Sequence, residues 1–330
     1  MTILFTSAGR RVALIRAFYH AFETLGISGR VVATDLSATA PALYAVDRGC
    51  IVPPVTSPEY IEVLEAICRS EDVTAIIPTI DPDLPVLAAA REQIEGSTGA
   101  RVIVSPPELI QLTSDKRRTP ELFARAGVRH PRQYERSEVE AGQVAFPVFA
   151  KPPRGFAAVG TQRLDTADDL RSLLARSPDT VVEEYIEGPE YSCDVLCDLS
   201  GGLVAAVPRR RLEVRAGEVT RTRTEEAPDI VEAVERVCDG AGFRGPIILQ
   251  CLLDEQTGPP CFFEINARFG GGVLAAIGAG ADYPRYLLEM LLGRKPSYRT
   301  YERGLYLLRY EDAIYRRELI EDGTSVWRER

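Results

Sequence analysis

Oxygen-bearing side chains that could hold a metal ion gather near the end of the chain, within residues 246–272. Glu264 and Asn266 lie two positions apart, so in a strand both side chains would point to the same face. Gln250 interrupts an apolar run shortly before them, and Arg268 follows them directly. One carboxylate and two amide oxygens suit Mg²⁺, a hard cation that usually shares its ligands with substrate phosphates. The residue types therefore predict a metal and phosphate site, against the simpler interpretation of a polar strand end.

A β-hairpin is the element that would position these side chains. Two apolar runs, 247–253 and 261–265, are joined by a turn-rich linker at 256–260. This pattern is typical of two paired strands with a longish loop. Three successive glycines, 270–272, come soon after the second run.

Lysine is rare in this chain, which makes its positions informative. Of the 39 lysines and arginines, only Lys116, Lys151 and Lys295 are lysines. Lys151 ends an expected strand and leads into the loop 152–160, and Lys116 lies where a helix reaching about residue 126 would begin. A retained lysine indicates that a compact ammonium is wanted there, and a solvated surface lysine is the alternative interpretation.

The length, net charge and composition of the chain narrow the class of protein. A chain of 330 residues is long enough for two or three domains. The net charge of −9 argues against a nucleic-acid surface. No run is long enough to span a bilayer, and Arg10 and Arg11 follow the first apolar run rather than precede it as in a signal peptide, so we expect a cytoplasmic location and no membrane partner. The seven cysteines lack paired spacing and are expected to be buried, and the two histidines, His20 and His130, offer few candidates for a catalytic base.

The first part of the chain alternates short apolar runs with helical patterns. Strands are expected near 2–6, 31–34, 50–52, 73–77 and 101–104, with helices near 14–25, 58–69 and 84–95 between them. Such alternation favours a parallel, doubly wound sheet. The first strand-to-helix turn could hold an anion, but it lacks the glycines of a dinucleotide fingerprint, so a structural turn or a small-substrate contact is the favoured interpretation.

Two later stretches carry charge in suggestive places. The run 181–186 predicts a strand that leads into a linker between two lobes, and alternation predicts that only one of Glu183 and Glu184 lines a cleft. The arginine-rich segment 208–223 is either a solvated edge strand or an anion clamp.

Taken in order, Lys116, Lys151 with its small-residue loop, the stretch VVEEYIEGPE at 181–190, Gln250 and the stretch EINAR at 264–268 resemble the ATP-grasp superfamily. The resemblance is greatest to the branch that contains the large subunit of carbamoyl-phosphate synthetase. It implies an α/β and α+β chain in which a doubly wound parallel-sheet domain precedes a two-lobed ATP-grasp fold. The implied domains are 1–112 before the ATP site, 113–183 as the small lobe with the phosphate loop, 184–297 as the large lobe with the metal site, and 298–330 as an extension.

The resemblance also implies a role for each site residue. ATP would be bound by the following groups: Lys116 and Lys151 at the phosphates, Gly155 in the covering loop, Glu184 and the Ile186 backbone at adenine, and Glu190 at the ribose. Mg²⁺, for which Mn²⁺ could substitute, would be bound by Gln250, Glu264 and Asn266. Arg268 and Lys151 would be catalytic, together with Arg210, for which Arg209, Arg211 and Arg223 are the other candidates. The alternative for these arginines is structural pairing with Glu213, Glu218, Glu225 and Glu226.

The expected reaction follows from the same resemblance. The enzyme would phosphorylate a small-molecule carboxylate and let an amine attack the acyl-phosphate, releasing ADP and phosphate. Phosphoryl transfer needs positioning and charge stabilisation more than a nucleophile, which fits a chain with two histidines. Phosphorylation of a bicarbonate-like acid and a non-catalytic ATP-binding module are the alternatives. The sequence departs from the pattern at Phe156-Ala157-Ala158, where glycine and serine are usual, and at Ala267, where proline is usual. Residues 296–330 could add a closing strand with a helix or form an oligomer contact, and a homodimer is left open.

Overall fold

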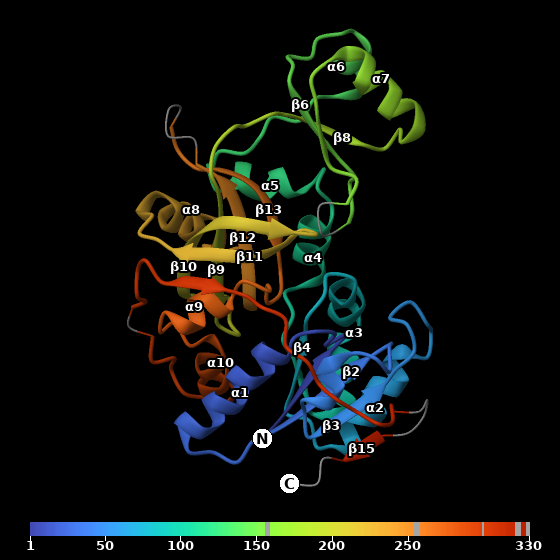
Figure 1. Cartoon of the computed structure of the whole chain (residues 1–330), viewed down its shortest axis with the longest axis vertical. Helices are drawn as coiled ribbons and strands as arrows, with labels where there is room; N and C mark the ends of the chain where they lie inside the picture. The colour runs from blue at the N-terminus through green and yellow to red at the C-terminus, as the bar shows by residue number, and fades with distance from the viewer. Residues whose placement is uncertain (156–158, 254–257, 299, 321–324, 328–330) are drawn as a thin grey trace.

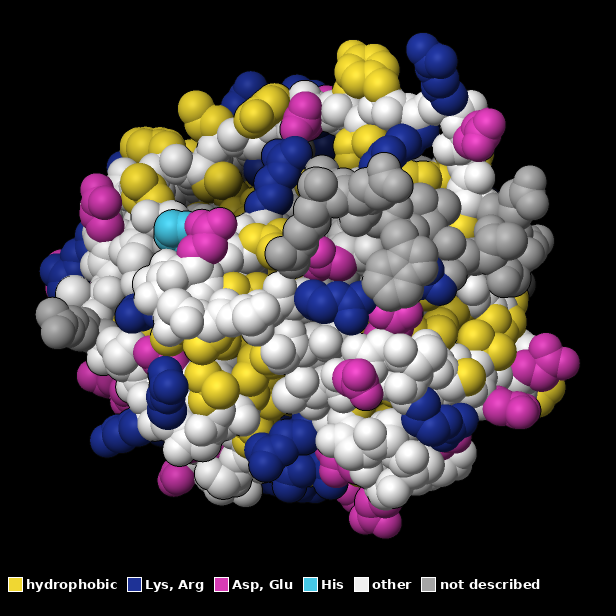
Figure 2. All heavy atoms as spheres, turned by 90° about the horizontal axis from the view of Figure 1, so that it is seen from below, with side chains coloured by type: hydrophobic (Ala, Val, Ile, Leu, Met, Phe, Trp, Pro, Cys, Tyr) yellow, Lys and Arg dark blue, Asp and Glu magenta, His cyan; other side chains and the backbone are white. Residues whose placement is uncertain are grey.

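The structure is a computed structural model that describes residues 1–155, 159–253, 258–298, 300–320 and 325–327. The loop residues Phe156-Ala157-Ala158 and the first two residues of the predicted hairpin linker, Gln256 and Thr257, therefore lie outside the described residues. None of the helices in the described ranges is long and apolar enough to cross a membrane. On the face drawn in Figure 2, basic and acidic side chains of the described residues intermingle.

The N-terminal part folds around a six-stranded sheet of order β15-β3-β2-β1-β4-β5. Its strands are β1 (Thr2–Thr6), β2 (Arg30–Asp35), β3 (Arg48–Ile51), β4 (Ala75–Pro78), β5 (Arg101–Val102) and β15 (Ser325–Trp327). The pairs among β1 to β5 are parallel, so the doubly wound parallel sheet predicted from the sequence is confirmed. Helix α1 (Val12–Leu25) packs on one face through Ile15 and Phe18, whereas α2 (Tyr60–Ser70) and α3 (Asp83–Thr98) cover the other, and a short 3-10 helix, η1 (Pro41–Tyr44), precedes β3.

A small three-stranded sheet projects from the rest of the molecule (Figure 1). It consists of β6 (Val148–Lys151), β7 (Gln162–Leu164) and β8 (Val181–Glu184), all antiparallel, with α6 (Arg136–Glu140) and α7 (Ala167–Arg176) beside them. The sheet has a core of its own, in which Val148, Leu164 and Leu170 are buried. A separate core allows this lobe to carry the loop after Lys151 as a unit.

The large sheet has the order β13-β12-β9-β10-β11-β14 and is antiparallel throughout. Its strands are β9 (Glu190–Cys197), β10 (Leu203–Arg215), β11 (Glu218–Thr224), β12 (Gly245–Leu252), β13 (Cys261–Asn266) and β14 (Tyr306–Leu308). Helix α8 (Pro228–Cys238) lies on one face, and α9 (Leu274–Gly278) and α10 (Tyr283–Leu291) lie on the other. The predicted hairpin strands are β12 and β13, paired so that Gln250 is opposite Glu264.

The helix predicted to begin near Ser114 begins later. Helix α4 (Pro107–Ser114) ends at that residue, and α5 (Thr119–Arg125) starts after a short turn that contains Lys116. Pro120 lies in the first turn of α5, where its fixed φ favours a helix start. This proline explains why the prediction was wrong by about one turn.

The C-terminal segment connects the two large sheets. Strand β14 pairs with β11, and β15 pairs with β3 of the first sheet. Each of the two main cores contains side chains from both sheets: Leu4 and Val195 share one core, and Phe5 and Val207 share the other. Of the two interpretations of residues 296–330, the added strand is therefore present, whereas the oligomer contact and the domain boundaries stay predictions.

One buried ion pair gives a test of the large sheet. Arg209 and Asp194 are 2% and 1% exposed, and two hydrogen bonds of 2.7 and 3.2 Å join the guanidinium to the carboxylate. We expect Asp194→Asn to destabilise the protein by about 3 kcal/mol, because it leaves an uncompensated buried charge. Chemical unfolding measures the loss. The control is Asp168→Asn, which removes an exposed carboxylate paired with Arg171, and equal stability of the two variants would contradict the prediction.

Candidate active site

A cavity of about 700 Å³ lies between the small sheet and the large sheet. A cavity of this size is typical of small-molecule sites. Every site residue predicted from the sequence except Arg210 lines it; these are Lys116, Lys151, Gly155, Glu184, Ile186, Glu190, Gln250, Glu264, Asn266 and Arg268. The fold thus brings together residues from α4–α5, β6, β8, β12 and β13 that are far apart in the sequence.

The oxygen-bearing residues lie on the two hairpin strands, β12 and β13. Gln250 and Glu264 are opposite each other in the β12–β13 register, and Asn266 follows two residues later. The Lys116 Nζ atom is 3.6 Å from Glu264 Oε1. The described residues contain no cluster of three or more His, Cys, Asp and Glu that could hold a metal. One carboxylate and two amides fit a hard cation such as Mg²⁺ whose remaining ligands come from phosphates and water.

Two ammonium groups lie near the position where the loop after β6 begins. Lys151 is 3% exposed, and its Nζ atom is 2.7 Å from Glu183 Oε2. The Lys116 Nζ atom donates to the Gly155 carbonyl oxygen at 2.8 Å. Gln133 Nε2 donates to the other oxygen of Glu183 at 3.0 Å, so this carboxylate has a fixed orientation toward Lys151. The arrangement presents two cations to an anion in the cavity.

The prediction that only one of Glu183 and Glu184 lines the cleft was wrong. Both line the cavity, because β8 ends at Glu184 and strand alternation stops there. Glu183 forms an ion pair with Lys151. Nothing in the sequence indicated this contact beyond the position of Glu183 next to Glu184. Glu184 Oε1 accepts a hydrogen bond from the Arg132 amide at 3.1 Å.

Glu190, at the start of β9, lines the cavity beside Arg211. Its Oε1 atom is 3.0 Å from Arg211 Nε, and Arg211 is largely buried. Burial raises the pKa of Glu190, while the Arg211 guanidinium opposes this change. Burial also lowers the pKa of Arg211, with Glu190 opposing. The two groups form a partly desolvated ion pair in the cavity wall.

The structure does not place Arg210 in the cavity. Alternation along β10 directs Arg210 to the opposite face from Arg209 and Arg211, and it is Arg211 that lines the cavity. Arg209 is bound to Asp194, and Arg223 to Glu225 at 2.6 Å. Among its arginines, the arginine-rich segment therefore contributes one, Arg211, to the cavity lining, whereas Arg209 and Arg223 form structural ion pairs.

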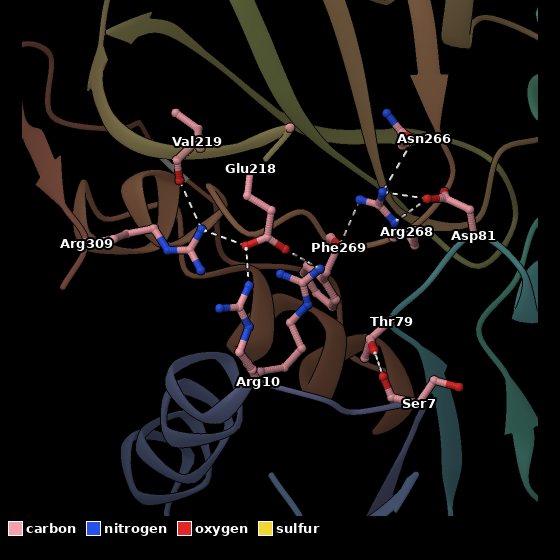
Figure 3. Close-up of polar contacts among 12 residues, drawn as sticks. Ser7, Arg10, Thr79, Asp81, Glu218, Val219, Asn266, Arg268, Phe269 and Arg309 are labelled. Atoms are coloured by element: carbon pink, nitrogen blue, oxygen red, sulfur yellow. Dashed lines mark hydrogen bonds and ion pairs between the residues drawn. The ribbon is translucent and has the colours of Figure 1, made fainter. Parts of the chain in front are cut away.

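Arg268 has a partner that the sequence did not indicate. Its Nη2 atom is 2.7 Å from Asp81 Oδ2, in the segment after β4, and 3.4 Å from Asn266 Oδ1 (Figure 3). Asp81 belongs to the N-terminal part, so that part holds the guanidinium beside Asn266 in the cavity. No local pattern marks a contact between residues so distant in the chain.

Comparisons with known proteins agree with this architecture. Residues 3–103 match the PylC-like N-terminal domain, and residues 176–313 match a domain described as ATP-grasp in the biosynthetic pathway with Ter operon. The fold and the two matches describe a chain in which an N-terminal α/β domain precedes an ATP-grasp domain. The resemblance to the ATP-grasp superfamily predicted from the sequence is thus confirmed by the match over residues 176–313.

Similar proteins include two curated relatives. The chain is 29% identical over 262 residues to carbamoyl-phosphate synthase of Methanobrevibacter smithii, an alignment that covers 73% of this chain and 68% of that protein. It is 32% identical over 167 residues to D-alanine--D-alanine ligase of Corynebacterium urealyticum, covering 46% of this chain and 45% of that one. The chain thus spans about two thirds of the first relative and less than half of the second.

Solved structures share the fold at low identity. The biotin carboxylase domain of 2-oxoglutarate carboxylase from Hydrogenobacter thermophilus, in complex with MgADP and bicarbonate, matches with a TM-score of 0.71 and 20% identity over 92% of this chain and 73% of that one. N5-carboxyaminoimidazole synthetase from Staphylococcus aureus matches with a TM-score of 0.69 and 16% identity over 89% of this chain and 78% of that one. These matches confirm the fold.

Substitution of Glu264 tests the metal assignment. We expect Glu264→Gln to raise the Mg²⁺ concentration needed for half-maximal ADP release by about 10- to 100-fold, because it removes the one carboxylate of the oxygen set. A Mg²⁺ titration in an ADP-release assay measures this change. The control is Glu232→Gln on the exposed side of α8, and a Glu264→Gln variant with an unchanged Mg²⁺ requirement would refute the assignment.

The raised pKa of Glu190 leads to a pH prediction. If ionised Glu190 accepts hydrogen bonds from the nucleotide ribose, affinity is complete above its pKa and falls as the pH drops through it. Because burial raises that pKa, we expect affinity for MgADP to weaken at a higher pH than for an exposed glutamate. Calorimetric titration of the wild type and of Glu190→Gln isolates this effect from protonation of ADP itself. Identical pH profiles of MgADP affinity for the two proteins would exclude a contribution from ionised Glu190.

Proposed function

We propose that the protein is an ATP-dependent, ADP-forming ligase that phosphorylates a substrate carboxylate and joins the acyl group to an amine. One observation carries the proposal: two ammonium groups, an oxygen ligand set and Arg268 face a single cavity. These groups match the needs of phosphoryl transfer, which relies on positioning and charge stabilisation. The names of the curated relatives support the same reaction class.

The residues at the nucleotide end would bind and orient ATP. Glu184 and the Ile186 backbone would contact adenine, and Glu190 would accept hydrogen bonds from the ribose. Lys116 and Lys151 would bind the phosphates, with Glu183 holding Lys151 in place at 2.7 Å. The loop containing Gly155 would cover the phosphates.

The residues at the other end would hold the reacting groups. Gln250, Glu264 and Asn266 would bind Mg²⁺, or Mn²⁺ in its place, and the bound cation would supply positive charge that neutralises the phosphates. A carboxylate oxygen of the acid attacks the terminal phosphorus as the bond to ADP breaks, and Arg268 stabilises the charge on the transferred group. The amine then attacks the acyl carbon, phosphate leaves, and the amine nitrogen loses a proton. Arg211 replaces Arg210 as the cavity arginine in this scheme.

The substrates, the oligomeric state and the cellular location of the protein are also proposals. The substrates are small molecules, as the cavity volume of about 700 Å³ suggests. A homodimer and a cytoplasmic location stay predictions. Phosphorylation of a bicarbonate-like acid is the second candidate, favoured by the likeness to carbamoyl-phosphate synthase.

A coupled assay for ADP tests the proposal. We expect ADP release from MgATP only when an acid and an amine are both present, because the acyl-phosphate must be consumed for turnover. The panel crosses amino acids and dicarboxylates with amino acids and ammonia as acceptors, and bicarbonate is included among the acids. Release that requires bicarbonate would select the second candidate, and MgATP binding without ADP release from any pair would show a binding module instead. Lys151→Gln, which removes a cavity cation, is the negative control.

A further inference from the structure

A group of arginines surrounds Glu218 at the junction of the N-terminal part and the large sheet (Figure 3). The Arg309 Nη1 atom donates to Glu218 Oε2 at 3.1 Å and to the Val219 carbonyl oxygen at 2.9 Å. Arg11 Nη2 is 3.5 Å from Glu218 Oε1, and Arg10 Nη2 is 3.8 Å from Glu218 Oε2. We call Arg10, Arg11 and Arg309 with Glu218 the arginine cluster. Its members come from the β1–α1 turn, β11 and the segment after β14.

Two of these guanidiniums converge on Gly271. A Cβ atom at this position would lie 2.9 Å from Arg309 Nη1 and 3.0 Å from Arg11 Nη1. Gly271 follows Arg268 by three residues, and Arg268 lines the cavity. Gly217, the neighbour of Glu218, lines it as well. The arginine cluster therefore lies directly beyond the metal end of the cavity.

The charges of this region do not balance. Asp81 pairs with Arg268 at 2.7 Å, which leaves Glu218 as the carboxylate that faces the three arginines of the cluster. The Arg10 side chain is 77% exposed and can be solvated, whereas those of Arg11 and Arg309 are 18% and 25% exposed. Two shielded guanidiniums against one carboxylate leave one positive charge, and a single carboxylate from a ligand would neutralise it.

The pKa shifts of these groups agree with an excess of positive charge in the cluster. Burial lowers the pKa of Arg11; Glu218 and, more weakly, Asp81 oppose this change, whereas Arg268 and Arg309 add to it. Burial by itself would raise the pKa of Glu218, but the guanidiniums of Arg11, Arg309 and Arg10 hold it below its usual value. In addition, α1 begins directly after Arg11 and has no acidic residue in its first turn, so its N-terminus adds a partial positive charge.

We propose that the arginine cluster binds a second substrate carboxylate, one that takes no part in the chemistry, through Arg11 and Arg309. The inference rests on the proposed function, since it places a substrate across the metal end of the cavity. It defines the substrate class: either the acid is a dicarboxylate, or the amine is an amino acid whose own carboxylate is held here. An ion-pair network that only joined the two parts of the fold would have no need for the uncompensated charge.

A binding experiment without turnover tests this proposal. The dicarboxylates malonate to adipate, their monoamides, and a panel of amino acids are titrated calorimetrically into the protein with MgADP. We expect at least one probe to bind and its carboxamide analogue to bind at least tenfold more weakly. We also expect Arg11→Gln to lower the affinity for the probe at least tenfold. Arg16→Gln, which removes an exposed arginine of α1 paired with Asp312, is the matched control and should bind as the wild type does. No binding by any probe, or binding equal in Arg11→Gln and wild type, overturns the proposal.

A second variant keeps the test decisive if Arg11→Gln fails to fold. Gly271→Ala retains every charge, and no positive φ makes alanine strained there, but the added Cβ displaces the two guanidiniums. Probe affinity should again fall at least tenfold while MgADP affinity stays unchanged. Loss of MgADP binding in the wild type would instead count against the proposed function, so the two failures are distinguishable.

Kinetics assign the carboxylate to one substrate. With the pair found by the ADP assay, a rise in KM for the acid alone in Arg11→Gln shows a dicarboxylate acid, and a rise for the amine alone shows an amino-acid acceptor. The kcat value should change much less than KM, because the group binds but does not react. Unchanged KM for both substrates overturns the proposal.

Discussion

The close approach of the backbone after β13 to three different parts of the molecule is the constraint on which the rest of the structure depends. A Cβ at Gly270 would be 2.1 Å from Ile248 Cδ1, one at Gly271 would crowd Arg11 and Arg309, and one at Gly272 would be 2.4 Å from Arg209 Cζ. The glycine run therefore touches the hairpin, the N-terminal part and the buried ion pair of the large sheet at once. The contacts of Gly270 and Gly272 fix Arg268 and Asn266, which precede the run, relative to the large sheet. Precise placement of charge is what phosphoryl transfer requires, and here it comes from a backbone without side chains.

Periodicity and turn chemistry were enough to predict most of the fold. Alternating short apolar runs and helical patterns predicted the parallel sheet of β1 to β5, and the two apolar runs of the hairpin predicted β12 and β13. Pairing between distant segments was out of reach, since β15 joins β3 by contacts that no local pattern encodes. The start of α5 was missed because the choice of Ser114 as a cap ignored Pro120, which is the second residue of the helix.

In the candidate site too, residues marked by local motifs were predicted, whereas contacts between distant segments were not. Residues defined by local motifs, such as Glu264 and Asn266, were placed in the cavity correctly because a strand fixes the direction of its side chains. Arg210 was chosen over Arg211 because the register of β10 relative to the cavity depends on its pairing with β9 and β11. The contacts of Lys151 with Glu183 and of Arg268 with Asp81 were not predicted, and the latter joins residues that are 187 positions apart.

The contact between Arg268 and Asp81 has a further consequence for how specificity and chemistry are divided. The residues proposed to bind the nucleotide come from the small and large sheets, whereas Arg268, beside the residues proposed to bind the metal, is paired with Asp81 of the N-terminal part. Arg11 and Glu218 face each other across the same boundary. Because none of the residues proposed to bind metal or phosphate lies in the N-terminal part, changes in its β1–α1 turn can alter which substrate is held without altering the groups proposed to bind ATP. The two cores that run through both sheets keep this arrangement rigid, so a change of substrate would come from side chains at the boundary rather than from a shift of the domains.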